Sequence, residues 1–236
     1  MEENKDIEMN IADTVIEKPI CFKIGNRRFF LYPPTLGKTY LLARLIKSLE
    51  VNEKIMSYNP YMEALRLCEE KKSAVCRILA YHSLLKKRDI IDEGKVKSRQ
   101  LLFEKSLDDK ELATMLVLVL SNEDTNAYMQ YLGIDKDREK RQRVSSVKKQ
   151  SGSITFGGKS IYGTMIDFAC QRYGWTMEYV VWGISYANLK MLMADALTSV
   201  YLSEEERKNS GISDDEDVID AGSPENIGLM REIINE

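Results

Sequence analysis

The sequence predicts a mainly α-helical protein, in which an N-terminal β-hairpin is followed by a helical bundle and then by a small three-helix C-terminal unit. Two short apolar runs flank Gly25-Asn26, apolar side chains recur at helical spacing from residue 35 to 133, and this spacing returns between tight corners in residues 161–203. With 236 residues, 44% of them hydrophobic, the chain is long enough to bury one ordinary core or two small ones.

Residues 1–18 are acidic, with six Asp or Glu side chains against Lys5 and Lys18. A segment with high net charge and few large apolar residues does not bury enough surface to offset its loss of chain entropy. We therefore expect a disordered N-terminus that ends at residue 18.

A β-hairpin is expected at the start of the next region, residues 19–134. The stretch "PICFKIGNRRFFLYPP" places Gly25 first in a two-residue turn, the position that requires a positive φ in one of the tight hairpin turns. A lone hairpin is marginal in water. The following helices must therefore cover its apolar face, which consists of Phe22, Ile24, Phe29 and Leu31.

The rest of residues 19–134 is expected to form four or five helices. Asn59-Pro60 is a typical helix start, and Gly133 is a typical end. Two apolar stripes carry the helical period, Leu42, Leu45, Ile46 and Leu49 in the first and Tyr61, Leu65, Cys68, Val75 and Leu79 in the second.

Gly37-Lys38-Thr39 raises the question of a phosphate-binding loop. That loop needs a glycine five residues before its Gly-Lys pair, and this position holds Tyr32. Pro33 and Pro34 follow, and neither has an N–H group to donate to a phosphate. We interpret the stretch instead as a strand end followed by a helix that Thr35 caps.

Residues 135–160 change abruptly to a basic, polar and Gly/Ser-rich composition. A basic cluster binds nucleic acid by releasing counterions, so this segment is a candidate nucleic-acid arm. It lacks the aromatic residues that would stack on bases, and we therefore favour a solvated linker between domains. The candidate phosphate contacts are Arg138, Lys140, Arg141, Arg143, Lys148 and Lys149.

Residues 161–203 predict three helices joined by tight corners. Gly174 stops the first helix, Thr176 caps the second, and Ser185 caps the third. Both tryptophans fall here, and a pattern rich in methionine and aromatic residues is typical both of a core and of an adaptable surface for a partner helix. The candidate partner-binding residues are Trp175, Trp182, Tyr186, Leu189, Met191 and Met193.

The tail, residues 204–236, holds eleven acids against three basic residues. We expect most of it to be disordered. Ser223-Pro224 begins a short amphipathic stretch with Ile227 and Met230 on one side, which predicts a short terminal helix.

The sequence contains no recognisable catalytic, cofactor or metal site. The four cysteines have no C-x-x-C spacing, and His82 is the single histidine, so neither a zinc site nor a catalytic dyad is expected. No apolar run reaches the roughly 20 residues of a membrane span, and the acidic start lacks the apolar core of a secretory signal. We expect a non-enzymatic protein without cofactors that stays where it is made.

The stretch "MIDFACQRYGWTMEYVVWGISYANLKMLMADAL", residues 165–197, resembles the tail assembly chaperones of long-tailed bacteriophages. The shared features are an aromatic-Gly-Trp-Thr corner after a helix, a short helix that ends in an aromatic residue and glycine, and a Leu-rich helix that begins near a tyrosine. The basic segment and the acidic tail depart from the small members of that family.

This resemblance implies a role in the cytoplasm of the infected host. The family coats the apolar tape measure protein until tail tube subunits polymerise around it, so the implied partners are the tape measure protein and the tail tube protein. Nucleic-acid binding through residues 136–149 and a minor structural role in the virion are the alternatives, and self-association stays open.

Overall fold

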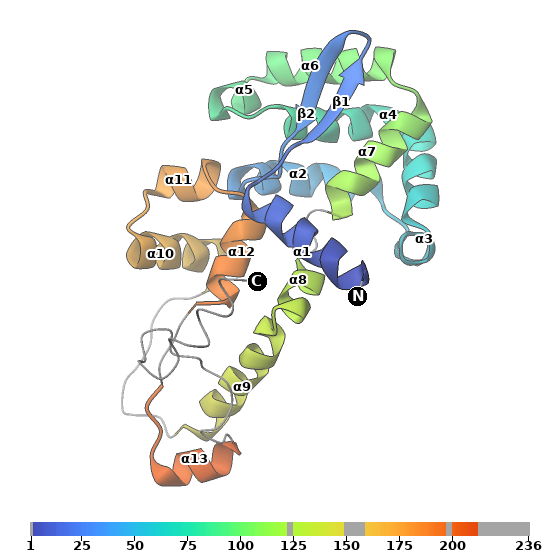
Figure 1. Cartoon of the computed structure of the whole chain (residues 1–236). Coiled ribbons are helices and arrows are strands. Elements are labelled where there is room, and N and C mark those ends of the chain that lie inside the picture. The colour runs from blue at the N-terminus through green and yellow to red at the C-terminus, as the bar shows by residue number, and fades with distance from the viewer. Residues whose placement is uncertain (1, 122–124, 149–158, 197–199, 212–236) are drawn as a thin grey trace, which may run out of the picture. The chain divides into compact units, whose positions relative to one another are not determined.

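The computed structural model describes residues 2–121, 125–148, 159–196 and 200–211. It confirms the mainly helical class with one short antiparallel hairpin near the N-terminus (Figure 1). By contacts, the chain divides into two compact units, one of residues 1–136 with 155–197 and another of residues 137–154 with 198–236.

The hairpin pairs β1 (Ile20–Ile24) with β2 (Arg27–Leu31) in the register that places Phe22 opposite Phe29. Gly25 has φ +57, as the turn prediction requires. The Phe22 and Phe29 rings pack on Phe103, with ring centroids 5.6 and 5.9 Å away. A helix thus covers the apolar face of the hairpin, as expected.

The helices after the hairpin surround one long central helix. They are α2 (Leu36–Leu49), α3 (Glu53–Tyr58), α4 (Pro60–Ser83), α5 (Lys87–Ile91), α6 (Glu93–Ser106) and α7 (Asp109–Ser121). Leu67, Val75 and Leu79 of α4 are fully buried, and they form a main core with α2, α6, α7 and the hairpin. Side-chain oxygens of Thr35, Asn52 and Asn59 cap the starts of α2, α3 and α4.

The C-terminal half contains α8 (Asn126–Tyr131), α9 (Ile134–Val147), α10 (Ile161–Tyr173), α11 (Met177–Trp182), α12 (Tyr186–Ala194) and α13 (Glu204–Ser210). The predicted caps are confirmed, because the Thr176 hydroxyl accepts from the Tyr179 N–H at 3.2 Å and the Ser185 hydroxyl from the Asn188 N–H at 3.2 Å. Met165 of α10, Val180 of α11 and Leu189 of α12 form a second core.

Helices α10–α12 do not stand apart as a separate module. Thr35 forms an isolated antiparallel β-bridge with Ser185, and the Tyr186 N–H donates to the Pro34 carbonyl at 2.8 Å. Leu36, the first residue of α2, is buried in the second core. We call these contacts between residues 34–37 and 182–186 the seam.

The N-terminus and the basic segment also differ from expectation. Residues 2–15 form helix α1 (Glu2–Val15) rather than a disordered segment, and Ile7, Ile11 and Val15 recur along it with a spacing of four. The prediction of disorder was based on the acidic composition and did not use this apolar stripe. The stripe lets the helix pack beside α8 and α12 (Figure 1).

The predicted linker is likewise helical at its start, because α9 runs to Val147, while residues 149–158 lie outside the described residues. In the acidic tail, Ser203 and Glu206 form a reciprocal capping box that opens α13. The predicted terminal helix after Ser223 lies outside the described residues.

The seam predicts that Gly37 tolerates no side chain. A Cβ atom on Gly37 would lie 2.8 Å from ring atoms of Trp182, so either the helix or the indole would have to move. Gly37→Ala should therefore lower the free energy of unfolding by about 1–3 kcal/mol in urea titrations.

Gly163→Ala in α10 is the matched control. A Cβ there meets its nearest neighbour at an ordinary 3.5 Å. Because alanine favours the helix, this change should leave stability unchanged or raise it by up to about 1 kcal/mol. Equal losses from both substitutions would contradict the packing role of Gly37.

Candidate apolar binding groove

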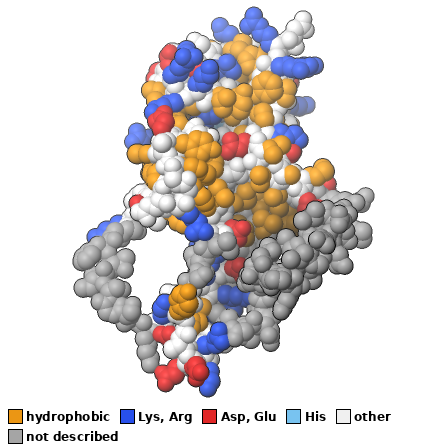
Figure 2. Space-filling view, turned by 60° about the vertical axis from the view of Figure 1, so that its left-hand side comes forward, with side chains coloured by type: hydrophobic (Ala, Val, Ile, Leu, Met, Phe, Trp, Pro, Cys, Tyr) orange, Lys and Arg blue, Asp and Glu red, His pale blue; other side chains and the backbone are white. Residues whose placement is uncertain are grey.

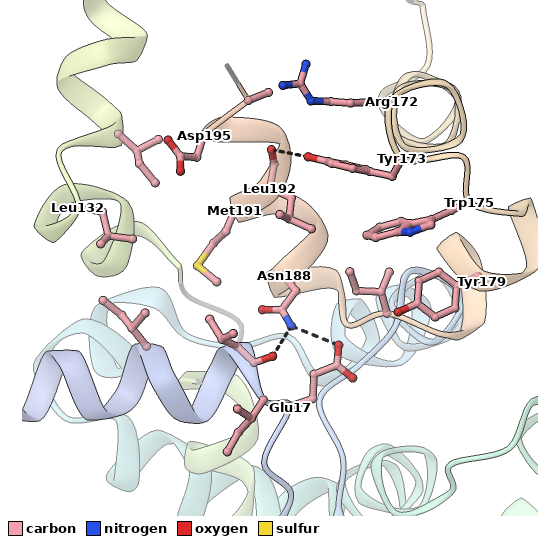
Figure 3. Close-up of a pocket in the computed structure, with 16 residues that line it drawn as sticks. Glu17, Leu132, Arg172, Tyr173, Trp175, Tyr179, Asn188, Met191, Leu192 and Asp195 are labelled. Carbon is pink, nitrogen blue, oxygen red and sulfur yellow. Dashed lines mark hydrogen bonds between the residues drawn. The ribbon is translucent and has the colours of Figure 1, made fainter. Parts of the chain in front are cut away.

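An apolar groove opens between four parts of the unit formed by residues 1–136 and 155–197. Its walls are the end of α1, the α8–α9 turn, the α10–α11 corner and α12, and its cavity volume is about 760 Å³ (Figure 3). That volume lies within the roughly 300–1,000 Å³ typical of ligand sites. The lining residues are Ile11, Val15, Ile16, Glu17, Leu132, Ile134, Arg172, Tyr173, Trp175, Tyr179, Ile184, Asn188, Met191, Leu192, Asp195 and Ala196.

Three aromatic rings form one wall of the groove. Tyr173 and Trp175 lie 4.7 Å apart between ring centroids, and Trp175 meets Tyr179 edge-on at 5.1 Å. The Tyr173 hydroxyl donates to the Leu192 carbonyl at 3.4 Å, which ties this wall to α12 (Figure 3). Aromatic rings of this kind supply large, rigid apolar contact areas.

A network of hydrogen bonds fixes α1 to the start of α12. The Glu17 carboxylate accepts from the Ser185 N–H at 2.6 Å and from the Asn188 amide at 3.3 Å. Asn188 also donates to the Val15 carbonyl at 3.1 Å (Figure 3). A carboxylate at the N-terminus of a helix is favoured by the helix dipole. These bonds hold the α1 wall of the groove in place.

Of the six predicted partner-binding residues, the structure places Trp175 and Met191 in the groove wall. Leu189 is fully buried in the second core, and Tyr186 and Met193 pack half-buried against that core. Trp182 packs on the main core and above Gly37. These four side chains pack between helices and do not line the groove.

The other walls of the groove were not among the predicted partner-binding residues. Tyr179 and Leu192 belong to the three predicted helices, and Ile11, Val15 and Ile16 belong to a segment predicted to be disordered. The spacing of four from Ile7 to Val15 was the available signal for α1. Nothing in the sequence indicated that α1 would pack near α12.

Lys38 and Thr39 lie in the first turn of α2, and the Lys38 side chain is buried and not open to a phosphate in solvent. The Lys38 side chain is 1% exposed, its Nζ lies 5.8 Å from the centroid of the Tyr32 ring, and it has no hydrogen-bond partner among the described residues. The Thr39 hydroxyl donates to the Thr35 carbonyl at 3.1 Å. Burial lowers the pKa of Lys38 from 10.5 to about 8.

His82 is buried next to Tyr32. Its Nδ1 lies 3.2 Å from the Tyr32 carbonyl oxygen. Burial, reinforced by the nearby Lys38 cation, lowers the pKa of His82 to about 3, so the imidazole is neutral at pH 7. Burial likewise raises the pKa of Cys68 and of Cys76 to about 12, which keeps both thiols protonated.

The candidate nucleic-acid contacts lie along α9 and just after it. Arg138, Arg143 and Lys148 are exposed, whereas Lys140 and Arg141 are half-buried. Lys149 lies outside the described residues. Three acids, Asp135, Asp137 and Glu139, alternate with the basic residues in the first turns of α9 and reduce its positive charge.

The described residues contain neither a metal-binding cluster nor a membrane-spanning helix. No group of three or more His, Cys, Asp or Glu side chains in this part of the chain could hold a metal ion. None of the helices described is both long and apolar enough to cross a membrane.

Comparisons with known protein families, curated proteins and solved structures gave no match to this chain.

The buried charge of Lys38 predicts that Lys38→Met stabilises the protein at pH 7. A pKa lowered from 10.5 to about 8 means that the folded state disfavours the ammonium group, by about 3 kcal/mol at 1.4 kcal/mol per pKa unit. Methionine of similar length removes this penalty, and the free energy of unfolding should rise by up to that amount in urea titrations.

The gain should depend on pH. Between pH 8 and 10.5 the unfolded chain binds the lysine proton more tightly than the folded chain, so the stability of the wild type rises with pH across this window. The difference between Lys38→Met and the wild type should therefore shrink above pH 8. A constant or growing difference would contradict the burial of a charged amine.

Proposed function

We propose that this protein is a non-enzymatic tail assembly chaperone of a long-tailed bacteriophage, and that its groove binds an apolar helical segment of the tape measure protein. The observation that carries the proposal is the groove itself, whose walls are mostly apolar and include Trp175 and Met191 of the stretch that resembles the family. The protein would act in the cytoplasm of the infected host, before the virion is complete.

The groove has the chemistry that an amphipathic helix requires. Helices and the turns between them form its walls. Side chains at positions i, i+3 and i+4 of a bound helix would enter the groove between the aromatic wall and α1. Only three of the residues that line the groove are charged, Glu17, Arg172 and Asp195. A mostly apolar lining with few charged groups suits the apolar side of an amphipathic helix.

An assembly chaperone must also release its client. The tape measure protein has long apolar helical faces that aggregate when exposed. Methionine and leucine side chains such as Met191 and Leu192 adapt to different sequences at modest affinity per contact, so polymerising tube subunits could displace the chaperone. Tube subunits are the second partner in this proposal.

The proposal predicts the effect of placing carboxylates in the groove. Ile16 and Leu192 line it with 68% and 37% of their surface exposed, so Ile16→Glu with Leu192→Glu should leave the fold intact. On co-expression with the tape measure protein of the same phage, this variant should solubilise and co-purify at least about tenfold less of it than the wild type, because buried carboxylates find no partner in an apolar contact.

Met62→Glu with Leu85→Glu is the control. Both side chains are exposed apolar residues that do not line the groove. This variant should solubilise as much tape measure protein as the wild type. If the wild type itself neither solubilises nor co-purifies the tape measure protein, the proposed function is wrong.

A further inference from the structure

The outer face of the hairpin carries a compact group of cations. Side chains alternate along both strands, so Cys21 and Phe30 form one cross-strand pair on the solvent side, and Lys23 and Arg28 form the next. Arg27 pairs with Ile24 next to the turn, so the same alternation places its side chain at the edge of the opposite face, where it is exposed. Figure 2 shows Lys and Arg side chains at the top of the molecule, the end at which Figure 1 draws the hairpin together with α5 and α6.

These cations are not neutralised within the described part of the chain. The hairpin, residues 20–31, contains no acid, and no ion pair found among the described residues includes Lys23, Arg27 or Arg28. Like charges directly opposite each other on a β-ribbon destabilise it. The Lys23–Arg28 pair therefore costs the fold stability, which points to a role in binding an anion.

An aromatic surface adjoins the cations. The Phe30 side chain is 37% exposed, although the neighbouring Phe22 and Phe29 are turned into the main core. The Tyr32 ring lies 6.3 Å from Phe30 between centroids, at an interplanar angle of 37°. A phosphate or an acidic peptide needs no exposed ring, whereas unpaired bases stack on one.

We propose that the outer face of the hairpin, formed by Lys23, Arg28 and Phe30 with Arg27 at the adjoining turn, binds single-stranded nucleic acid. Lys23 and Arg28 contact phosphates on this face, Arg27 contacts a further phosphate beside the turn, and the Phe30 ring accepts a base. This site does not depend on the groove, since none of its four residues lines the groove. It also differs from the α9 segment, where acids alternate with the basic residues.

Fluorescence anisotropy of a labelled oligothymidine of about 15 nucleotides, measured across KCl concentrations, tests the proposal. Three phosphate contacts predict a slope of log K against log salt of about −2. Reversing the charges with Lys23→Glu, Arg27→Glu and Arg28→Glu should abolish binding. Phe30→Ala should weaken binding by about tenfold and leave the slope unchanged.

The matched control reverses three exposed cations of the other basic region, with Arg138→Glu, Arg143→Glu and Lys148→Glu. It should change the affinity by less than about twofold. If the hairpin reversal fails to fold by circular dichroism, the Lys23→Gln, Arg27→Gln and Arg28→Gln triple variant replaces it.

Three results would overturn the proposal. The first is no binding by the wild type at the lowest salt concentration. The second is loss of binding in the α9 variant with retention in the hairpin variant. The third is equally tight binding of polyglutamate that Phe30→Ala does not weaken, which would assign the face to an acidic protein segment instead.

Discussion

The packing of Trp182 against the start of α2 is the contact on which the remaining structure depends. A helix can approach an indole this closely only where it lacks a side chain, and Gly37 provides that place. The adjoining β-bridge between Thr35 and Ser185 satisfies backbone groups at the same point. Two parts of the chain that are distant in sequence are thereby joined, and each of the two cores contains residues of α2.

The groove is a consequence of the same seam. Ser185 caps α12 and also donates its N–H to Glu17, so the seam, the start of α12 and the end of α1 meet at one residue. The aromatic corner at Tyr173 and Trp175 then faces α1 across a space that no described side chain fills. Functional sites of this kind are expected where rigid elements meet.

Local chemistry made much of the fold predictable. The Gly25 turn, the Thr176 and Ser185 caps and the apolar stripes of α2 and α4 each depend on neighbouring residues alone. The groove could not be predicted, because it depends on which distant faces meet. Charge also misled the prediction for residues 2–15, where the stripe of Ile7, Ile11 and Val15 supports a helix only once α8 and α12 cover it.

The central claim is that the groove receives an apolar helix, and the fluorescence of Trp175 tests it most directly. In a folded Trp182→Phe variant, Trp175 is the remaining tryptophan of the chain and lies in the groove wall. Titration with a soluble peptide that carries an apolar helical segment of the tape measure protein should shift its emission to the blue and protect it from iodide quenching, with saturation. Binding of that peptide without any change in Trp175 emission or quenching would contradict the account.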